Sequence, residues 1–163
     1  HRPCRHVLRA VPVQHTIARD RSRDKSSRAG GTAVAILIDN MQWVLIACGV
    51  LTCTMIQAVF FPNGMMRAYF GEAATTPAAE MLMRNWGVLV VIGGVFLVYA
   101  AFTPAIRPAA LLSVGAGKLA FISLMVSQPS RFLKGQGLVA VIIDTIMVAL
   151  FAAYLWAAPA QPA

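Results

Sequence analysis

Charged residues are scarce in this sequence outside its first 28 positions. Only 12% of the 163 residues are charged, whereas 58% are hydrophobic, and a soluble domain is typically about a quarter charged. Eight of the fourteen Lys and Arg residues lie within the first 28 positions. The remaining chain has too few charged side chains to cover a water-exposed surface. We therefore predict an integral membrane protein.

Residues that commonly form catalytic and metal sites are also scarce. All three histidines lie within the first 15 positions, and the three cysteines form no Cys-x-x-Cys motif. Neither a zinc site nor a disulfide framework is expected from these positions. The sequence also contains no Gly-x-Ser-x-Gly, Walker or His-Glu-x-x-His motif. It therefore predicts no metal site, no cofactor and no catalytic residues, which favours a non-enzymatic role.

The first 32 residues form a basic tail that is rich in Arg, Ser and Gly and has no helical apolar period. We predict that this tail is disordered in water. Because it has no aromatic residues that could stack on bases, nucleic acid is not an expected partner. Basic residues next to a membrane domain instead indicate contact with anionic lipids and a cytoplasmic location.

Four hydrophobic runs within residues 33–158 are long enough to cross a bilayer, which needs about 20 residues each. We predict membrane spans over residues 41–61, 86–106, 109–127 and 138–158. Pro62-Asn63-Gly64 follows the first run and consists of residues that favour turns, so it predicts a turn there. The short connections between later runs make those helices antiparallel neighbours. The predicted fold class is all-α: an integral membrane four-helix bundle preceded by a disordered basic tail.

Small residues recur along the predicted spans. Gly87 and Gly94 lie seven residues apart in the second span, and Gly49 lies on a small or polar face of the first. Gly115 and Gly117 belong to the third span. Small residues let membrane helices approach one another closely. We predict that all five glycines lie at contacts between helices.

Two charged residues interrupt the last two spans at matching positions. Lys118 lies 13 residues before Arg131, and Asp144 lies 13 residues after it. In an antiparallel hairpin both lie at the same depth, roughly 20 Å from the turn at ~1.5 Å per residue. Because an isolated charge at the bilayer centre costs about 2.5–3.5 kcal/mol on insertion scales, we predict an ion pair. It either fastens the two helices together or forms a polar site for a proton, an ion or an anionic headgroup.

A second ion pair is predicted near the membrane surface. Thr76-Pro77 has the composition of a helix start, and Glu80 and Arg84 follow it. An acidic residue four positions before a basic one is the favourable order for a pair on one helix. We predict that Glu80 and Arg84 form this interfacial pair.

The basic tail determines the predicted orientation. With the N-terminus in the cytoplasm, the tail and Arg107 lie inside, while Arg67, Arg84, Arg131 and Lys134 lie outside. Without the tail, the count of basic residues would favour the opposite orientation. We predict a multi-pass protein of the cell membrane with a cytoplasmic N-terminus.

Three features are shared with a known group of proteins. They are a long first loop leading into Arg84-Asn85-Trp86-Gly87, a second turn bounded by prolines, and charges in the last two spans. In these respects the stretch from Met41 to Trp156 resembles the DoxX-like small four-helix bacterial membrane proteins. The resemblance implies a bundle in the bacterial inner membrane that is accessory to redox or quinone-linked membrane complexes. It implies no catalytic residue.

Three functions are compatible with this sequence. The abundance of packing residues favours a non-enzymatic accessory or scaffold subunit, which has the lipid bilayer and other membrane subunits or its own copies as partners. The charges Lys118 and Asp144 favour a small proton- or ion-coupled transporter. A subunit of a quinone-linked membrane oxidoreductase is the third alternative.

Overall fold

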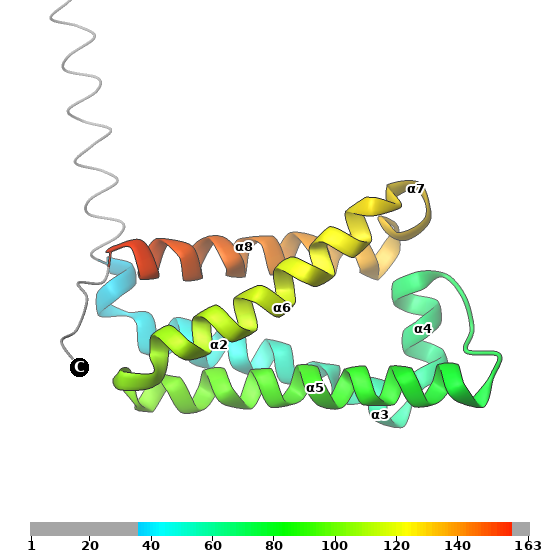
Figure 1. Cartoon of the computed structure of the whole chain (residues 1–163), viewed down its shortest axis with the longest axis horizontal. Coiled ribbons are helices and arrows are strands. Elements are labelled where there is room, and N and C mark those ends of the chain that lie inside the picture. The colour runs from blue at the N-terminus through cyan, green and yellow to red at the C-terminus, as the bar shows by residue number, and fades with distance from the viewer. Residues whose placement is uncertain (1–35, 158–163) are drawn as a thin grey trace, which may run out of the picture.

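The computed structural model describes residues 36–157 of the chain. The predicted disordered tail, residues 1–32, lies outside the described residues. Within residues 36–157 the regular elements are all helices, and no strand is present. The all-α class predicted from the sequence is confirmed (Figure 1).

Four helical segments run the length of the molecule, and two short helices connect them at one end (Figure 1). The elements in chain order are α2 (Met41–Cys53), η1 (Thr54–Ile56), α3 (Gln57–Phe60), α4 (Pro62–Phe70), α5 (Pro77–Phe102), η2 (Pro104–Ile106), α6 (Arg107–Ser127), α7 (Pro129–Phe132) and α8 (Gly135–Ala157). The 3₁₀ turn η1 joins α2 to α3 without a break, so these elements form one segment.

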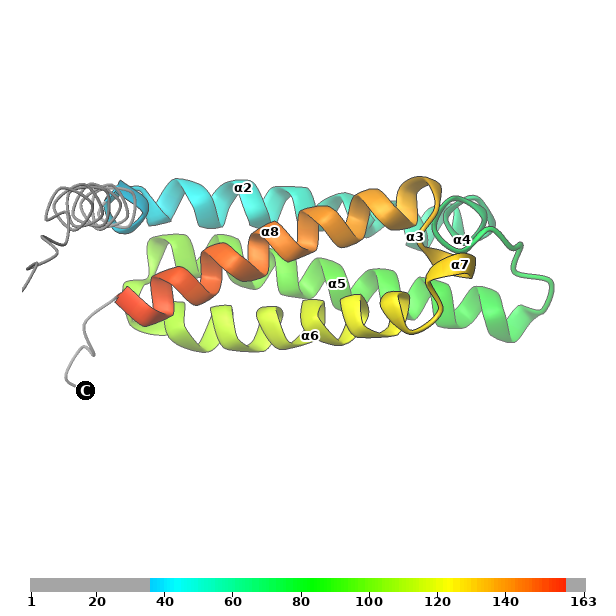
Figure 2. The same ribbon diagram turned by 90° about the horizontal axis from the view of Figure 1, so that it is seen from above.

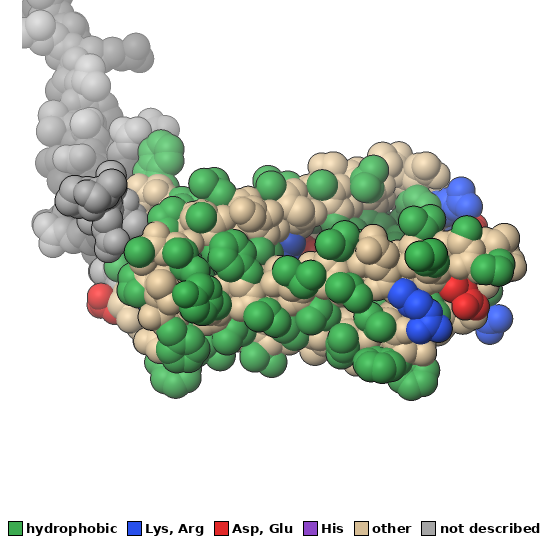
Figure 3. Space-filling model, turned by 60° about the horizontal axis from the view of Figure 1, so that its bottom comes forward, with side chains coloured by type: hydrophobic (Ala, Val, Ile, Leu, Met, Phe, Trp, Pro, Cys, Tyr) green, Lys and Arg blue, Asp and Glu red, His purple; other side chains and the backbone are tan. Residues whose placement is uncertain are grey.

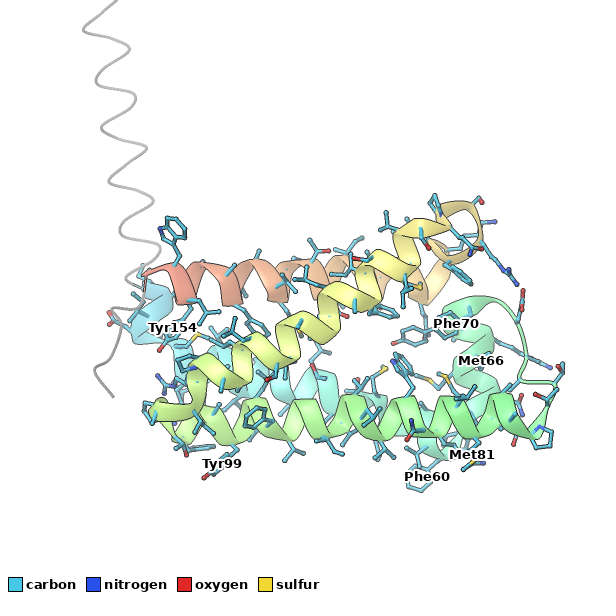
Figure 4. The ribbon with its side chains drawn as sticks, viewed as in Figure 1. Phe60, Met66, Phe70, Met81, Tyr99 and Tyr154 are labelled. Carbon is cyan, nitrogen blue, oxygen red and sulfur yellow. The ribbon has the colours of Figure 1, made fainter. Side chains whose placement is uncertain are left out.

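All four long segments are long and apolar enough to cross a membrane. They are Met41–Phe60, Pro77–Phe102, Pro104–Ser127 and Gly135–Ala157. In the most apolar 18-residue stretch of each segment, less than a third is buried inside the molecule. Most of the apolar side chains of these segments therefore face outward. Figure 3 shows hydrophobic side chains spread over the outer surface, and Figure 4 shows Phe60, Met81 and Tyr99 on it. The chain is therefore built as a multi-pass membrane protein.

The helix start predicted at Thr76-Pro77 is confirmed, and this helix continues into the second span. α5 begins at Pro77, where the Thr76 hydroxyl caps it by accepting a hydrogen bond of 3.2 Å from the Ala79 amide. It ends at Phe102 rather than residue 106. Thr103 precedes Pro104 and leaves the helical region, with φ −125° and ψ 85°, because a following proline disfavours the α conformation. Residues 104–106 therefore start the next segment.

The long helices form two hairpins. α2 packs against α5, and α6 packs against α8. Near the start of α2 and the end of α8, the two hairpins share one apolar core. Its most buried large side chains are Met41, Leu45, Leu97, Leu111 and Phe151. Figures 1 and 2 show that α2 begins and α8 ends at this same end of the bundle.

At the opposite end the hairpins are held apart by α4. α6 runs obliquely away from α5, and α4 stands across the bundle between α5 and α8 (Figure 1). A second, smaller apolar core forms there from Ala58, Met65 and Met83. The result is a bundle that is tightly packed at one end and wedged open at the other.

Glycines bring α2 and α5 into close contact. A Cβ atom added at Gly94 would lie 2.6 Å from Cys53 Sγ and 2.8 Å from the Gly49 carbonyl oxygen. One added at Gly49 would lie 2.7 Å from the Gly94 carbonyl oxygen, and one at Gly87 would lie 2.8 Å from Ala58 Cβ. Three of the five predicted packing glycines thus lie where only glycine fits without a shift.

The other two predicted packing glycines are less constrained. A Cβ atom at Gly115 would make ordinary contact with Phe151, at 3.7 Å, whereas one at Gly117 has nothing within 4 Å. Gly117 therefore does not lie at a helix contact, because α5 and α6 have diverged at its level. Gly137, which was not among the predicted packing glycines, does lie at a close contact. A Cβ atom there would lie 2.6 Å from the carbonyl oxygens of both Tyr69 and Phe132.

Candidate functional site

The structure joins Lys118 and Asp144 in an ion pair between α6 and α8. The Lys118 ammonium donates a hydrogen bond to Asp144 Oδ1. The side chains of Lys118 and Asp144 are only 10% and 17% exposed, respectively, and both lie near the middle of their helices. Because Lys118 and Asp144 lie equally many residues from Arg131, they reach the same depth in the hairpin, which allows this contact. The pair fastens the second hairpin together.

The ion pair also lines a cavity of about 380 Å³ between the two hairpins. α2, η1, α4, α5, α6 and α8 all contribute to its wall, which is mostly apolar. Figure 3 shows a hollow midway along the molecule with a basic and an acidic side chain visible inside it. The charges are therefore not sealed between α6 and α8; they are accessible from a space large enough for a small molecule.

Tyr69 lines this cavity from α4 and adds a phenol to its polar groups. The close approach of α8 at Gly137 holds the end of α4 against α8, and Gly71, with φ +77°, ends α4 two residues later. Burial, and secondarily the negative charge of Asp144, raise the pKa of the Tyr69 phenol. Its hydroxyl thus stays protonated at neutral pH and can donate a hydrogen bond.

Aromatic rings surround the polar groups. The Trp86 ring lies 6.2 Å from that of Tyr69, edge to face, and 6.1 Å from that of Phe121, nearly parallel. All three residues line the cavity. Phe70, the last residue of α4 (Figure 4), packs edge to face against Phe132, with 5.9 Å between the ring centroids. Such contacts stabilise the arrangement of the rings, and Tyr69, Trp86 and Phe121 give the cavity an aromatic wall.

Thr52 is the remaining unusual group on the cavity wall. Its side chain is 6% exposed, and its hydroxyl has no hydrogen-bond partner among residues 36–157. A buried hydroxyl without a partner costs free energy. Sequence reasoning missed Tyr69, Trp86 and Thr52, because their shared location depends on how the two hairpins separate.

We expect Thr52→Val to stabilise the protein by about 1 kcal/mol, because it removes the unpaired hydroxyl while keeping the shape of the side chain. The measurement is unfolding in mild detergent. The matched control is Thr54→Val, since Thr54 is exposed and donates to the Leu51 carbonyl at 2.7 Å. This variant should change stability little. A loss of stability in Thr52→Val would contradict the structural account of this position.

The predicted ion pair between Glu80 and Arg84 is wrong. Glu80 accepts a hydrogen bond of 2.7 Å from the Asn63 amide, and Arg84 donates to the Val59 carbonyl. The carbonyls at the end of α3 lack helical partners, so they attract the guanidinium. Both residues hold α5 to the α3–α4 corner. An exposed ion pair forms instead between Arg131 and Glu72, at 2.6 Å.

The described part of the chain holds no group of three His, Cys, Asp or Glu residues placed to bind a metal. No protein family matches this sequence, and neither a curated protein nor a solved structure matches it. The chemistry of the cavity is therefore the basis for assigning a function.

Proposed function

We propose that this membrane protein binds a small lipophilic molecule in the cavity between its hairpins, with the polar group of that molecule beside Lys118 and Asp144. The observation that carries this proposal is the location of the ion pair on the cavity wall. Charges within membrane spans are expensive, and they commonly mark binding sites or transport pathways. A pair that served only to join α6 and α8 would not need an open space beside it.

The size and lining of the cavity support this function. Sites for small molecules are typically about 300–1,000 Å³ and mostly apolar, with a few polar groups that orient the ligand. The cavity of about 380 Å³ meets both conditions. Because it lies at the level of the membrane spans, its ligand can enter from the lipid phase and needs no aqueous solubility.

We further propose that the protein is an accessory subunit of a membrane complex in the bacterial inner membrane, with its N-terminus in the cytoplasm. Its resemblance to DoxX-like proteins implies this role. Mild crosslinking in native membranes, followed by purification, should recover the protein with other subunits or with copies of itself. Recovery as a lone monomer would contradict this role without affecting the ligand site.

Proton-coupled transport is a second candidate, favoured by the contact of an ionisable pair with a cavity. Reconstituted protein would then show substrate-dependent flux that is lost in Asp144→Asn. Absence of flux over a broad panel of substrates would exclude it and leave ligand binding without transport.

Gly117→Leu tests the binding function. Gly117 lines the cavity and has open space beside it, so a leucine side chain there should fill part of the cavity without displacing a neighbour. We expect mass spectrometry of protein purified in mild detergent to find bound small molecules on the wild type and far fewer on Gly117→Leu.

The matched control is Ala116→Leu, which changes an exposed neighbour outside the cavity wall. It should retain the bound molecules of the wild type. Equal retention by all three proteins, or none by the wild type, would contradict the proposed function.

A further inference from the structure

The charges on the cavity wall balance. Lys118 and Asp144 are the two charged residues that line the cavity within residues 36–157, and they are paired with each other. A ligand with a net charge would bring an uncompensated charge into a poorly solvated space, which is costly. It could be neutralised only by breaking the existing pair and leaving the other partner exposed to the same penalty. The site therefore selects against both anions and cations.

Two hydrogen-bond donors remain on the cavity wall beside the ion pair. The Tyr69 hydroxyl has no hydrogen-bond partner among the described residues, and the Lys118 ammonium has three N–H donors, of which one is directed to Asp144. These two groups come from different helices, α4 and α6, and reach the same cavity. A ligand oxygen that accepts hydrogen bonds, such as a carbonyl oxygen, complements this arrangement.

We propose that the ligand is an uncharged lipophilic molecule with a hydrogen-bond-accepting oxygen, which the Tyr69 hydroxyl binds beside the Lys118–Asp144 pair. The aromatic wall formed by Trp86 and Phe121 contacts its apolar part. This inference rests on the proposed binding function and adds to it the class of ligand and the residue that recognises its polar group.

Tryptophan fluorescence can report binding, because Trp86 lines the cavity while Trp43 and Trp156 are 68% and 93% exposed. A protein with Trp43→Phe and Trp156→Phe keeps Trp86 alone as the reporter. A protein with Trp86→Phe and Trp156→Phe keeps only the exposed Trp43 and measures nonspecific quenching in the detergent. Bromine quenches tryptophan at short range, so brominated probes reveal occupation of the cavity.

Three probes of equal chain length separate the ligand classes: methyl ω-bromoundecanoate, ω-bromoundecanoate at a pH where it is ionised, and ω-bromoundecyltrimethylammonium. We expect saturable quenching of Trp86 by the methyl ester. The concentration at half-saturation should be at least about tenfold lower for the ester than for either charged probe. This factor corresponds to a difference in binding free energy of about 1.4 kcal/mol. Stronger binding of a charged probe would overturn the inference while leaving the binding function intact.

Tyr69→Phe tests the recognition residue in the Trp86 reporter protein. It removes the hydroxyl but keeps the ring beside Trp86, so folding should be unaffected. We expect the concentration of methyl ester at half-saturation to rise about tenfold, because one hydrogen bond in a dry site is lost. The control Tyr99→Phe changes an exposed tyrosine on α5 and should have no effect. An unchanged affinity in Tyr69→Phe would overturn the role of Tyr69.

The outcomes also separate this inference from the proposed function. If no probe quenched Trp86 more than Trp43, the cavity would not be a binding site, and both proposals would fall. The other case is that the methyl ester binds Tyr69→Phe as tightly as the Trp86 reporter protein, and that the charged probes bind as tightly as the ester. In that case only the ligand class and its recognition by Tyr69 would be wrong.

Discussion

Asp144→Asn is expected to lower the free energy of unfolding by about 3–5 kcal/mol, because it leaves the Lys118 ammonium buried without a counter-charge. The asparagine side chain has nearly the same size, so packing between α6 and α8 is preserved. An unpaired charge is costly within a membrane span, and no second carboxylate lines the cavity beside Lys118 within residues 36–157. Unfolding in mild detergent, followed by circular dichroism, measures the loss.

The structure supplies a matched control for this substitution. Glu72→Gln breaks the ion pair with Arg131, in which both side chains are more than half exposed. Exposed pairs contribute only about 0–1 kcal/mol, so this variant should stay close to the wild type. If Asp144→Asn and Glu72→Gln had equal effects, the buried pair would not hold α6 and α8 together.

Gly94→Ala is expected to lower the free energy of unfolding by about 1–3 kcal/mol, the usual effect of overpacking a tight contact. The added methyl group would meet Cys53 Sγ at 2.6 Å, the Gly49 carbonyl oxygen at 2.8 Å and the Cys53 amide nitrogen at 3.0 Å. Two of these three atoms belong to the backbone, so no rotation of a side chain can remove the clash. α2 and α5 must move apart, which weakens the first hairpin.

The control for this effect is Gly117→Ala on α6. A methyl group there has nothing within 4 Å, and alanine is preferred over glycine inside a helix by about 0.5–1 kcal/mol. This variant should be as stable as the wild type or slightly more stable. A stability loss that was the same at Gly94 and Gly117 would indicate a general intolerance of helix substitutions rather than a close contact between α2 and α5.

The sequence contained enough information to predict the number of spans and the ion pair. Apolar runs of about 20 residues have few alternatives to membrane helices, and a short turn fixes the register of an antiparallel hairpin. Counting outward from Arg131 therefore placed Lys118 and Asp144 at one depth. The packing positions of Gly49, Gly87 and Gly94 were predictable because small residues mark close approaches between membrane helices, but the sequence did not indicate which helices meet there.

The cavity could not be predicted, because it depends on the angle between the two hairpins. That angle is set by α4, whose Tyr69 carbonyl approaches α8 at Gly137. The sequence shows α4 only as a short apolar stretch after Pro62. Its insertion between α5 and α8 brings Tyr69 close to Gly137, 68 positions later in the chain, a contact that no local pattern encodes.

The error at Glu80 and Arg84 has a similar origin. Their spacing permits a pair on one helix, but such a pair contributes only about 0.2–0.5 kcal/mol. Unpaired carbonyls at the end of α3 and the amide of Asn63 offer competing partners. These competitors come from a corner of the fold that forms only when α4 folds back on the bundle.

The measurement that tests this account most directly is a double-mutant cycle on the intramembrane pair, with Lys118→Met, Asp144→Leu and the double variant. These substitutions remove each charge and keep roughly the shape of the side chain, since leucine has the same branching as aspartate and methionine is unbranched like lysine. If the two charges stabilise each other, each single variant should be strongly destabilised, and the double variant should be more stable than either single variant. Losses that simply add in the double variant would contradict the pairing of Lys118 with Asp144.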